Sequence, residues 1–274
     1  MTGDSSMQQD QYVRAREVLL DALEVLRPHI ESITLVGAQA IYVWVGESAD
    51  INIPPYTTDA DLALNPQTLG SEPEILKALQ AAGFERLRDP GIWKSARNDV
   101  TVDLLVPEIL GGGGRRAARL PGHGKNTARK VQGLDSALID REKKRITALE
   151  LSDKRSFDTY VAGPAALLVA KLYKLWDRRD ATAREDAKDS LDLFRILRAS
   201  PTADLAGRIA LLMKDPFSQA ETHQALAYLD ELFQDENAHG AQMVGEAVGV
   251  LADREEVISS SVFLAHDLIA ATQE

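Results

Sequence analysis

The chain predicts an α+β protein, with a mixed sheet and flanking helices over residues 1–162 and an all-helical part over residues 163–274. Short β-branched and apolar runs, bounded by glycine or proline, are typical of strands and recur through the first part. Segments with apolar residues at helical spacing separate them. From Pro164 onward the spacing stays helical to the end of the chain. Breaks in that pattern fall near Ser200, Asp215 and His239.

The first part opens with a predicted helix over 8–29, where leucine and valine recur at helical spacing up to a proline. The β-branched run 32–36 predicts a strand that is broken by Gly37. The apolar run 38–45 that follows predicts a second helix. A strand, a glycine and a helix therefore succeed one another directly.

Two prolines predict a loop over 47–57, after which polar and apolar residues alternate over 58–64 as in a half-buried strand. Residues 72–82 predict a helix with a C-terminal glycine cap. The runs 91–97 and 100–106 predict two strands joined by a tight turn. Two further strands are expected within 145–161.

The composition limits the possible functions. With 45% hydrophobic residues and 27% charged residues, the chain is an ordinary globular sequence. It has no cysteine, which excludes disulfides, thiolate zinc sites and cysteine nucleophiles. No apolar run is long enough for a membrane span, and the polar N-terminus does not resemble a signal peptide. We therefore expect a cytoplasmic protein without membrane contact.

The charge distribution argues against a pure nucleic-acid binder, but not against an enzyme that uses nucleotides. The formal net charge is -11, whereas a protein that holds nucleic acid with its whole surface is usually basic. One local strip, Arg115–Lys130, follows a run of four glycines and contains no acidic residue. We expect this strip to form a flap or linker whose basic side chains contact an acidic acceptor such as RNA. Its basic members are Arg115, Arg116, Arg119, His123, Lys125, Arg129 and Lys130.

The residues that suggest chemistry are two aspartates on the predicted strand 58–64. Side chains alternate along a strand, so Asp59 and Asp61 point to the same face. Two such carboxylates repel one another unless a cation lies between them. Mg²⁺ prefers oxygen ligands, and two Mg²⁺ ions together activate a hydroxyl and stabilise a leaving pyrophosphate. The pattern predicts a two-ion magnesium site.

A third carboxylate and a phosphate-binding turn complete the prediction. Asp103 lies in a strand whose valines and leucines point the other way, and a carboxylate there is costly unless it is paired or bound to metal. Gly37 and Ala38 open a helix, whose N-terminal amides favour a phosphate group. We add Thr58, which begins the Asp-x-Asp strand, to the predicted nucleotide-binding residues.

These motifs resemble the polymerase-β-like nucleotidyltransferase superfamily, and the later part resembles AbiEii/MenT-type toxin nucleotidyltransferases. The second resemblance rests on a Lys171-Leu172 pair and on the run from Lys188 to Leu193, which contains Asp189 and Asp192. It spans about residues 31–195. The resemblance implies that Lys171 contacts the triphosphate of an NTP such as ATP and that Asp189 organises the site. The chain departs from the family at Ala38, where glycine or serine is usual, and lacks the arginine that often precedes Thr-x-Asp.

The sequence therefore predicts a magnesium-dependent nucleotidyltransferase, with its site in the cleft between the two parts. The resemblance implies an RNA acceptor such as a tRNA 3′ end, and a toxin role with a cognate antitoxin. Two alternatives stay open. The acceptor could be a small molecule or a protein, or the fold could be a catalytically degenerate binding module.

Overall fold

The computed structural model describes residues 3–46, 55–179, 184–249 and 251–273. The chain forms an α+β structure with a mixed sheet, flanking helices and a C-terminal helical region, which confirms the predicted class. It divides into two compact units, here called the sheet unit and the helical unit. The sheet unit comprises Met1–Ala40, Pro54–Leu134 and Arg141–Ala162, and the helical unit comprises Ile41–Ile53, Asp135–Asp140 and Gly163–Glu274.

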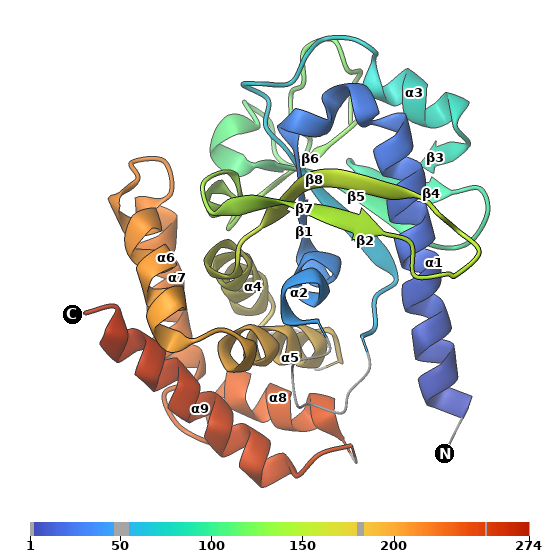
Figure 1. Cartoon of the computed structure of the whole chain (residues 1–274). Coiled ribbons are helices and arrows are strands. Elements are labelled where there is room, and N and C mark those ends of the chain that lie inside the picture. The colour runs from blue at the N-terminus through green and yellow to red at the C-terminus, as the bar shows by residue number, and fades with distance from the viewer. Residues whose placement is uncertain (1–2, 47–54, 180–183, 250, 274) are drawn as a thin grey trace. The chain divides into compact units, whose positions relative to one another are not determined.

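The described part of the sheet unit contains one eight-stranded mixed sheet (Figure 1). Its order is β3-β4-β5-β2-β1-β8-β7, and β6 pairs with β5 beyond the end of β4. The pairs β1–β8, β2–β5 and β5–β6 are parallel, and the others are antiparallel. The strands are β1 (Ile33–Val36), β2 (Asp59–Leu64), β3 (Phe84–Arg86), β4 (Ile92–Ser95), β5 (Thr101–Pro107), β6 (Arg129–Val131), β7 (Arg141–Thr147) and β8 (Ser156–Ala162).

The helix α1 (Gly3–Val25) runs along the sheet and contacts β2 and β5 (Figure 1). Its Leu19 and Leu23 are fully buried, as are Leu62 of β2 and Leu104 of β5. Burial of this apolar surface is the main force that holds helix and sheet together. The other helical segments of this part of the chain are the 3-10 turns η1 (Arg27–Ser32) and η2 (Glu108–Leu110), α2 (Gly37–Val45) and α3 (Ile75–Ala81).

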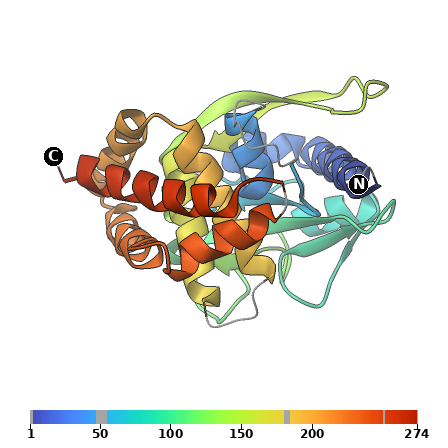
Figure 2. The same ribbon diagram turned by 90° about the horizontal axis from the view of Figure 1, so that it is seen from below.

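The hairpin of β7 and β8 forms the long arm at the top of Figure 2. Its outer strand β7 is an edge of the sheet and carries a run of charged residues, Arg141 to Arg145. Charged side chains on an edge strand oppose pairing with other chains. The hairpin therefore ends the sheet without exposing an apolar edge.

The helical unit is built from α4 to α9, with the 3-10 turn η3 (Asp135–Leu138). Helix α9 packs along α6 and α8, and α4 packs on α5 and α7 (Figure 2). Phe194 and Phe233 are among the large buried side chains of its core. The helices are α4 (Pro164–Arg178), α5 (Arg184–Ala199), α6 (Thr202–Lys214), α7 (Gln219–Leu232), α8 (His239–Val248) and α9 (Arg254–Ala271).

Several element boundaries differ from the prediction. The helix expected over 8–29 ends at Val25 and gives way to η1, because Pro28 cannot continue an α-helical ladder. Strands β3 and β6 were not predicted; each has three residues, too few for a periodic pattern. Residues 47–54 of the predicted loop lie outside the described residues. Within the described residues, no helix is both long enough and apolar enough to cross a membrane.

Candidate active site

The strand β2 presents Asp59 and Asp61 on one face of the sheet. Both side chains are partly exposed, whereas Ala60 and Leu62 between and beside them are fully buried on the opposite face. The alternation follows from strand geometry, since successive side chains point to opposite faces. One face of this strand builds the core, and the other carries the two carboxylates.

The third predicted carboxylate, Asp103, lies directly beside Asp61. The parallel pairing of β2 with β5 places these two residues as register partners, and Asp59 opposite Thr101. Neighbouring strands are about 4.8 Å apart, so the side chains of Asp61 and Asp103 leave the same face side by side. Asp103 is only 7% exposed.

The electrostatics of Asp103 reflect this crowding. Burial raises the pKa of Asp103 to about 7, and the negative charges of Asp61 and Asp59 add to the rise, against the opposing charge of Arg129. A solvent-exposed carboxyl group without like charges around it would lose its proton near pH 4. A cation bound beside Asp103 would oppose both the burial and the like charges and would stabilise its ionised form.

The partner of Asp103 in the structure is an arginine. Arg129 donates from its terminal NH2 nitrogen to Oδ2 of Asp103 in a short charged hydrogen bond. Arg129 belongs to β6, where it is the register partner of Leu105. This contact joins the basic strip to the carboxylates, and sequence reasoning did not anticipate it.

Gly37 permits the close approach of Asp61 to the start of α2. The glycine has a φ of 68°, and a β-carbon on it would lie 2.0 Å from Oδ2 of Asp61. Only glycine fits such a position. The Asp61 carboxylate therefore fills the position that a side chain on residue 37 would need, and the predicted phosphate contact of Gly37 and Ala38 stays a prediction.

Asp59 is held by two residues outside the predicted set. The Thr57 hydroxyl donates to Oδ1 of Asp59 at 2.6 Å, whereas the predicted Thr58 is exposed. The side chain of Gln39 donates to the Asp59 carbonyl at 3.1 Å and accepts from Nε of Arg16 at 2.9 Å. Gln39 is buried in α2. In the sequence it is a polar residue within an apolar helical run, and such a residue is expected to have a hydrogen-bond partner when buried.

The remaining predicted residues, Lys171 and Asp189, form a separate buried cluster inside the helical unit. The Lys171 ammonium donates to Oδ1 of Asp189 at 2.6 Å and to Oδ2 of Asp192 at 2.8 Å. Burial alone would raise the pKa of Asp189, but the charges of Lys171 and Lys174 hold it below its ordinary value. Lys171 is 5% exposed, and its ammonium already binds two carboxylates.

The rim of this cluster is basic. Lys174 lies 3.3 Å and Arg178 3.5 Å from the Asp189 carboxylate, and both side chains are partly exposed. Arg195 approaches Asp192 at 3.2 Å and the Tyr42 hydroxyl at 3.3 Å. Four cations therefore surround two carboxylates. Asp192 shares the Lys171 ammonium with Asp189.

The basic strip is tied to the sheet by backbone hydrogen bonds. Ala118 donates to the carbonyl of Ala128, and Lys130 donates to that of Arg116. His123 was predicted to belong to the basic strip. It is instead buried against the ring of His29, with ring centroids 5.2 Å apart, and is not part of the exposed basic surface. The exposed basic side chains of the strip are those of Arg115, Arg116, Arg119 and Lys125.

The donor set fits magnesium in chemistry and in charge. Asp59, Asp61 and Asp103 supply only oxygen, and their mutual repulsion favours a cation. Among the described residues, no group of three or more acidic or histidine side chains is already gathered as a complete metal site. Mg²⁺ commonly takes only one or two carboxylates and completes its shell with water and substrate phosphates. Asp59 and Asp61 meet that smaller requirement.

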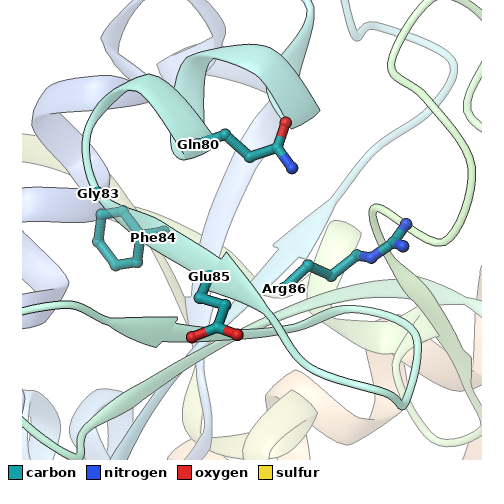
Figure 3. Close-up of a pocket in the computed structure, with 5 residues that line it drawn as sticks. All are labelled: Gln80, Gly83, Phe84, Glu85 and Arg86. Carbon is teal, nitrogen blue, oxygen red and sulfur yellow. The ribbon is translucent and has the colours of Figure 1, made fainter.

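A pocket of 440 Å³ on the sheet unit lies apart from these carboxylates (Figure 3). It is lined by residues of α3 and β3, and Figure 3 shows Gln80 and Arg86 reaching out on one side of it. Strand β3 is an edge of the sheet, and β4 separates it from β5. The pocket therefore does not include the candidate active site.

Comparison with protein-family models, with curated proteins and with solved structures finds no match to this chain. The assignment of function consequently rests on the geometry of the carboxylates and on their surroundings.

Proposed function

We propose that the protein is a magnesium-dependent nucleotidyltransferase with a nucleotidyltransferase fold, which transfers a nucleotide from an NTP to an acceptor hydroxyl. The observation that carries this proposal is the register of β2 and β5, in which Asp61 and Asp103 are partners and Asp59 shares their face. Strand β1, the Gly37 turn, α2 and β2 follow one another in the order expected for such a site.

In this proposal Asp59 and Asp61 would hold magnesium, which supplies charge for the triphosphate and lowers the pKa of the attacking hydroxyl. The acceptor oxygen attacks the α-phosphorus in line, and the bond to the bridging oxygen of pyrophosphate breaks. The proton of the hydroxyl passes to Asp103 or to solvent; otherwise Asp103 completes the metal site. Positioning and compensation of charge account for most of the acceleration in reactions of this kind.

RNA is the acceptor that the basic strip supports best. Arg115, Arg116, Arg119 and Lys125 expose four positive charges on a segment that joins directly to Arg129 of β6. Phosphate groups bind such side chains through charge, and this binding weakens with salt. A toxin whose activity is held in check by an antitoxin would fit a transferase that modifies RNA ends, as the resemblance implies.

Lys171 keeps its proposed role only if nucleotide binding rearranges its surroundings. Its ammonium is buried between Asp189 and Asp192, whereas Lys174 and Arg178 are partly exposed beside the same carboxylate. Within the helical unit, Lys174 and Arg178 are therefore the cations of this cluster that reach solvent, and Lys171 and Asp189 form the buried base that positions them.

The test is label transfer from α-labelled NTPs to total RNA in the presence of magnesium. Asp61→Asn should abolish transfer, because it removes a ligand charge without changing the side-chain volume. The matched control is Asp99→Asn, which changes an exposed aspartate paired with Lys94 and should leave transfer intact. Equal transfer by Asp61→Asn, or no label on RNA under any condition, would exclude the proposed reaction. Label on a protein or small molecule would assign a different acceptor.

A nucleotide-binding module without turnover is the second candidate. It is favoured by the pairing of Asp103 with Arg129, in which an arginine already binds one predicted metal ligand. In that case the protein would bind a magnesium–NTP complex in calorimetry, and neither RNA, protein nor small molecules would acquire label.

A further inference from the structure

The pairing of Asp103 with Arg129 is built into the sheet. Arg129 is the register partner of Leu105, and Leu105 lies two residues beyond Asp103 on β5. Residues two apart on a strand share a face, so Arg129 and Asp103 are diagonal neighbours on the face that also carries Asp61. The backbone of β6 thus holds the guanidinium beside this carboxylate.

The guanidinium of Arg129 has unused capacity for hydrogen bonding. Its NH2 nitrogen binds Asp103, but its buried Nε atom has no hydrogen-bond partner among the residues that the structure describes. A buried N–H group without a partner is unfavourable, and a ligand that accepts its hydrogen bond would remove this cost. The side chain is 36% exposed, so it is not locked in the core.

The charges of the site suggest what this arginine does. Three carboxylates and one guanidinium leave two excess negative charges, which a single divalent cation would neutralise. A second divalent cation would create a positive excess unless the triphosphate came with it. It would also compete with Arg129 for Asp103, since both cations need the same oxygen atoms.

We propose that Arg129 is a positioning residue that occupies Asp103 in place of a metal ion until the nucleotide arrives. This inference rests on the proposed function. In the free protein the guanidinium keeps Asp103 from binding a divalent cation. When the nucleotide binds, the guanidinium of Arg129 leaves Asp103 and donates hydrogen bonds to a phosphate oxygen. Its Nε–H group then has an acceptor. Full metal loading is thereby linked to substrate, and free protein does not assemble a complete site.

The test measures Mn²⁺ binding to the nucleotide-free protein. The concentration of free Mn²⁺ is obtained from its electron paramagnetic resonance signal. Arg129→Gln should bind Mn²⁺ about 10-fold more tightly than the unmodified protein, because a positive charge beside the ligand is removed. Arg129→Lys keeps the charge and should bind Mn²⁺ as weakly as the unmodified protein. Arg119→Gln removes the same charge from an exposed position of the strip and is the matched control. Equal Mn²⁺ affinity of Arg129→Gln and the unmodified protein would overturn the inference.

A second measurement does not depend on the folding of a variant. In the unmodified protein, the ¹⁵N resonance of Arg129 Nε should move when magnesium and a non-hydrolysable NTP are both present. An unchanged resonance with both ligands would also overturn the inference. Label transfer separates the two proposals. If the unmodified protein transfers label but the Mn²⁺ affinities are equal, only the role of Arg129 fails. If Arg129→Gln binds Mn²⁺ more tightly but the unmodified protein transfers no label, the proposed reaction fails. The competition between Arg129 and a metal ion for Asp103 then still stands.

Discussion

Gly37 and Asp61 approach each other so closely that a β-carbon on the glycine would lie 2.0 Å from a carboxylate oxygen of the aspartate. They lie side by side because Gly37 directly follows Val36, the last residue of β1, and Val36 is the register partner of Asp61 on β2. The backbone conformation at Gly37, where β1 turns into α2, therefore also determines whether the Asp61 carboxylate can keep its position.

This relationship predicts that Gly37→Ala both destabilises the fold and removes activity. The φ of 68° is unfavourable for alanine, and the new methyl group would displace Asp61. We expect a loss of about 2 kcal/mol or more in the free energy of unfolding, measured with urea. Gly207→Ala is the control, because Gly207 lies within α6 and an added β-carbon would meet nothing within 4 Å. That variant should gain up to about 1 kcal/mol. Similar effects of the two substitutions would contradict the proposed role of Gly37.

The pKa of Asp103 predicts a pH dependence of stability in metal-free protein. Burial and its acidic neighbours raise this pKa to about 7, so the folded state holds the proton more tightly than the unfolded state. The contribution of Asp103 to stability is therefore fully present below about pH 4 and is lost as the pH rises through 7. Asp103→Asn cannot ionise and should not show this loss. At about pH 8 we expect it to be more stable than the unmodified protein by about 1–3 kcal/mol, and similar at about pH 5.

The measurement is urea unfolding at both pH values with a chelator present. Addition of Mg²⁺ at pH 8 should stabilise the unmodified protein more than Asp103→Asn, because the cation compensates the ionised carboxylate. A stability difference between the two proteins that is the same at both pH values would show that Asp103 does not titrate in this range.

The buried cluster of the helical unit predicts a large difference between two lysines. Lys171→Met leaves Asp189 and Asp192 buried without their shared ammonium group and should cost about 3 kcal/mol of stability. Lys174→Met removes a partly exposed cation 3.3 Å from Asp189 and should cost less than about 1 kcal/mol. Thermal or urea unfolding of the two variants measures the difference. Equal costs would mean that the Lys171 pairs contribute no more than surface ion pairs.

Sequence patterns predicted the parts of the site that lie on regular strands. The alternation in 58–64 and 100–106 indicates which face Asp59, Asp61 and Asp103 occupy, because side-chain direction in a strand depends only on position. Thr57 was missed in favour of its neighbour because the residue that binds Asp59 lies before the strand, where alternation does not apply. Arg129 was assigned to a flap because its partner Asp103 is 26 residues away and β6 is too short to show a period. Long-range pairing of this kind depends on the tertiary fold.

The basic strip predicts salt-dependent binding of RNA. Replacing Arg115, Arg116 and Lys125 with glutamine removes three exposed charges from one segment. If each contacts a phosphate of single-stranded RNA, the slope of log K against log salt concentration should decrease by about 2, since each contact contributes about 0.7. Fluorescence anisotropy with a labelled RNA over a salt series gives this slope.

The matched control replaces Lys143, Lys144 and Arg145 of β7, which changes the net charge equally at a separate edge of the sheet. A specific role requires that only the first triple variant lose affinity, because the general field of the protein changes by the same amount in both. Equal losses would assign RNA binding to net charge, and unchanged binding in both would remove the strip from the acceptor site.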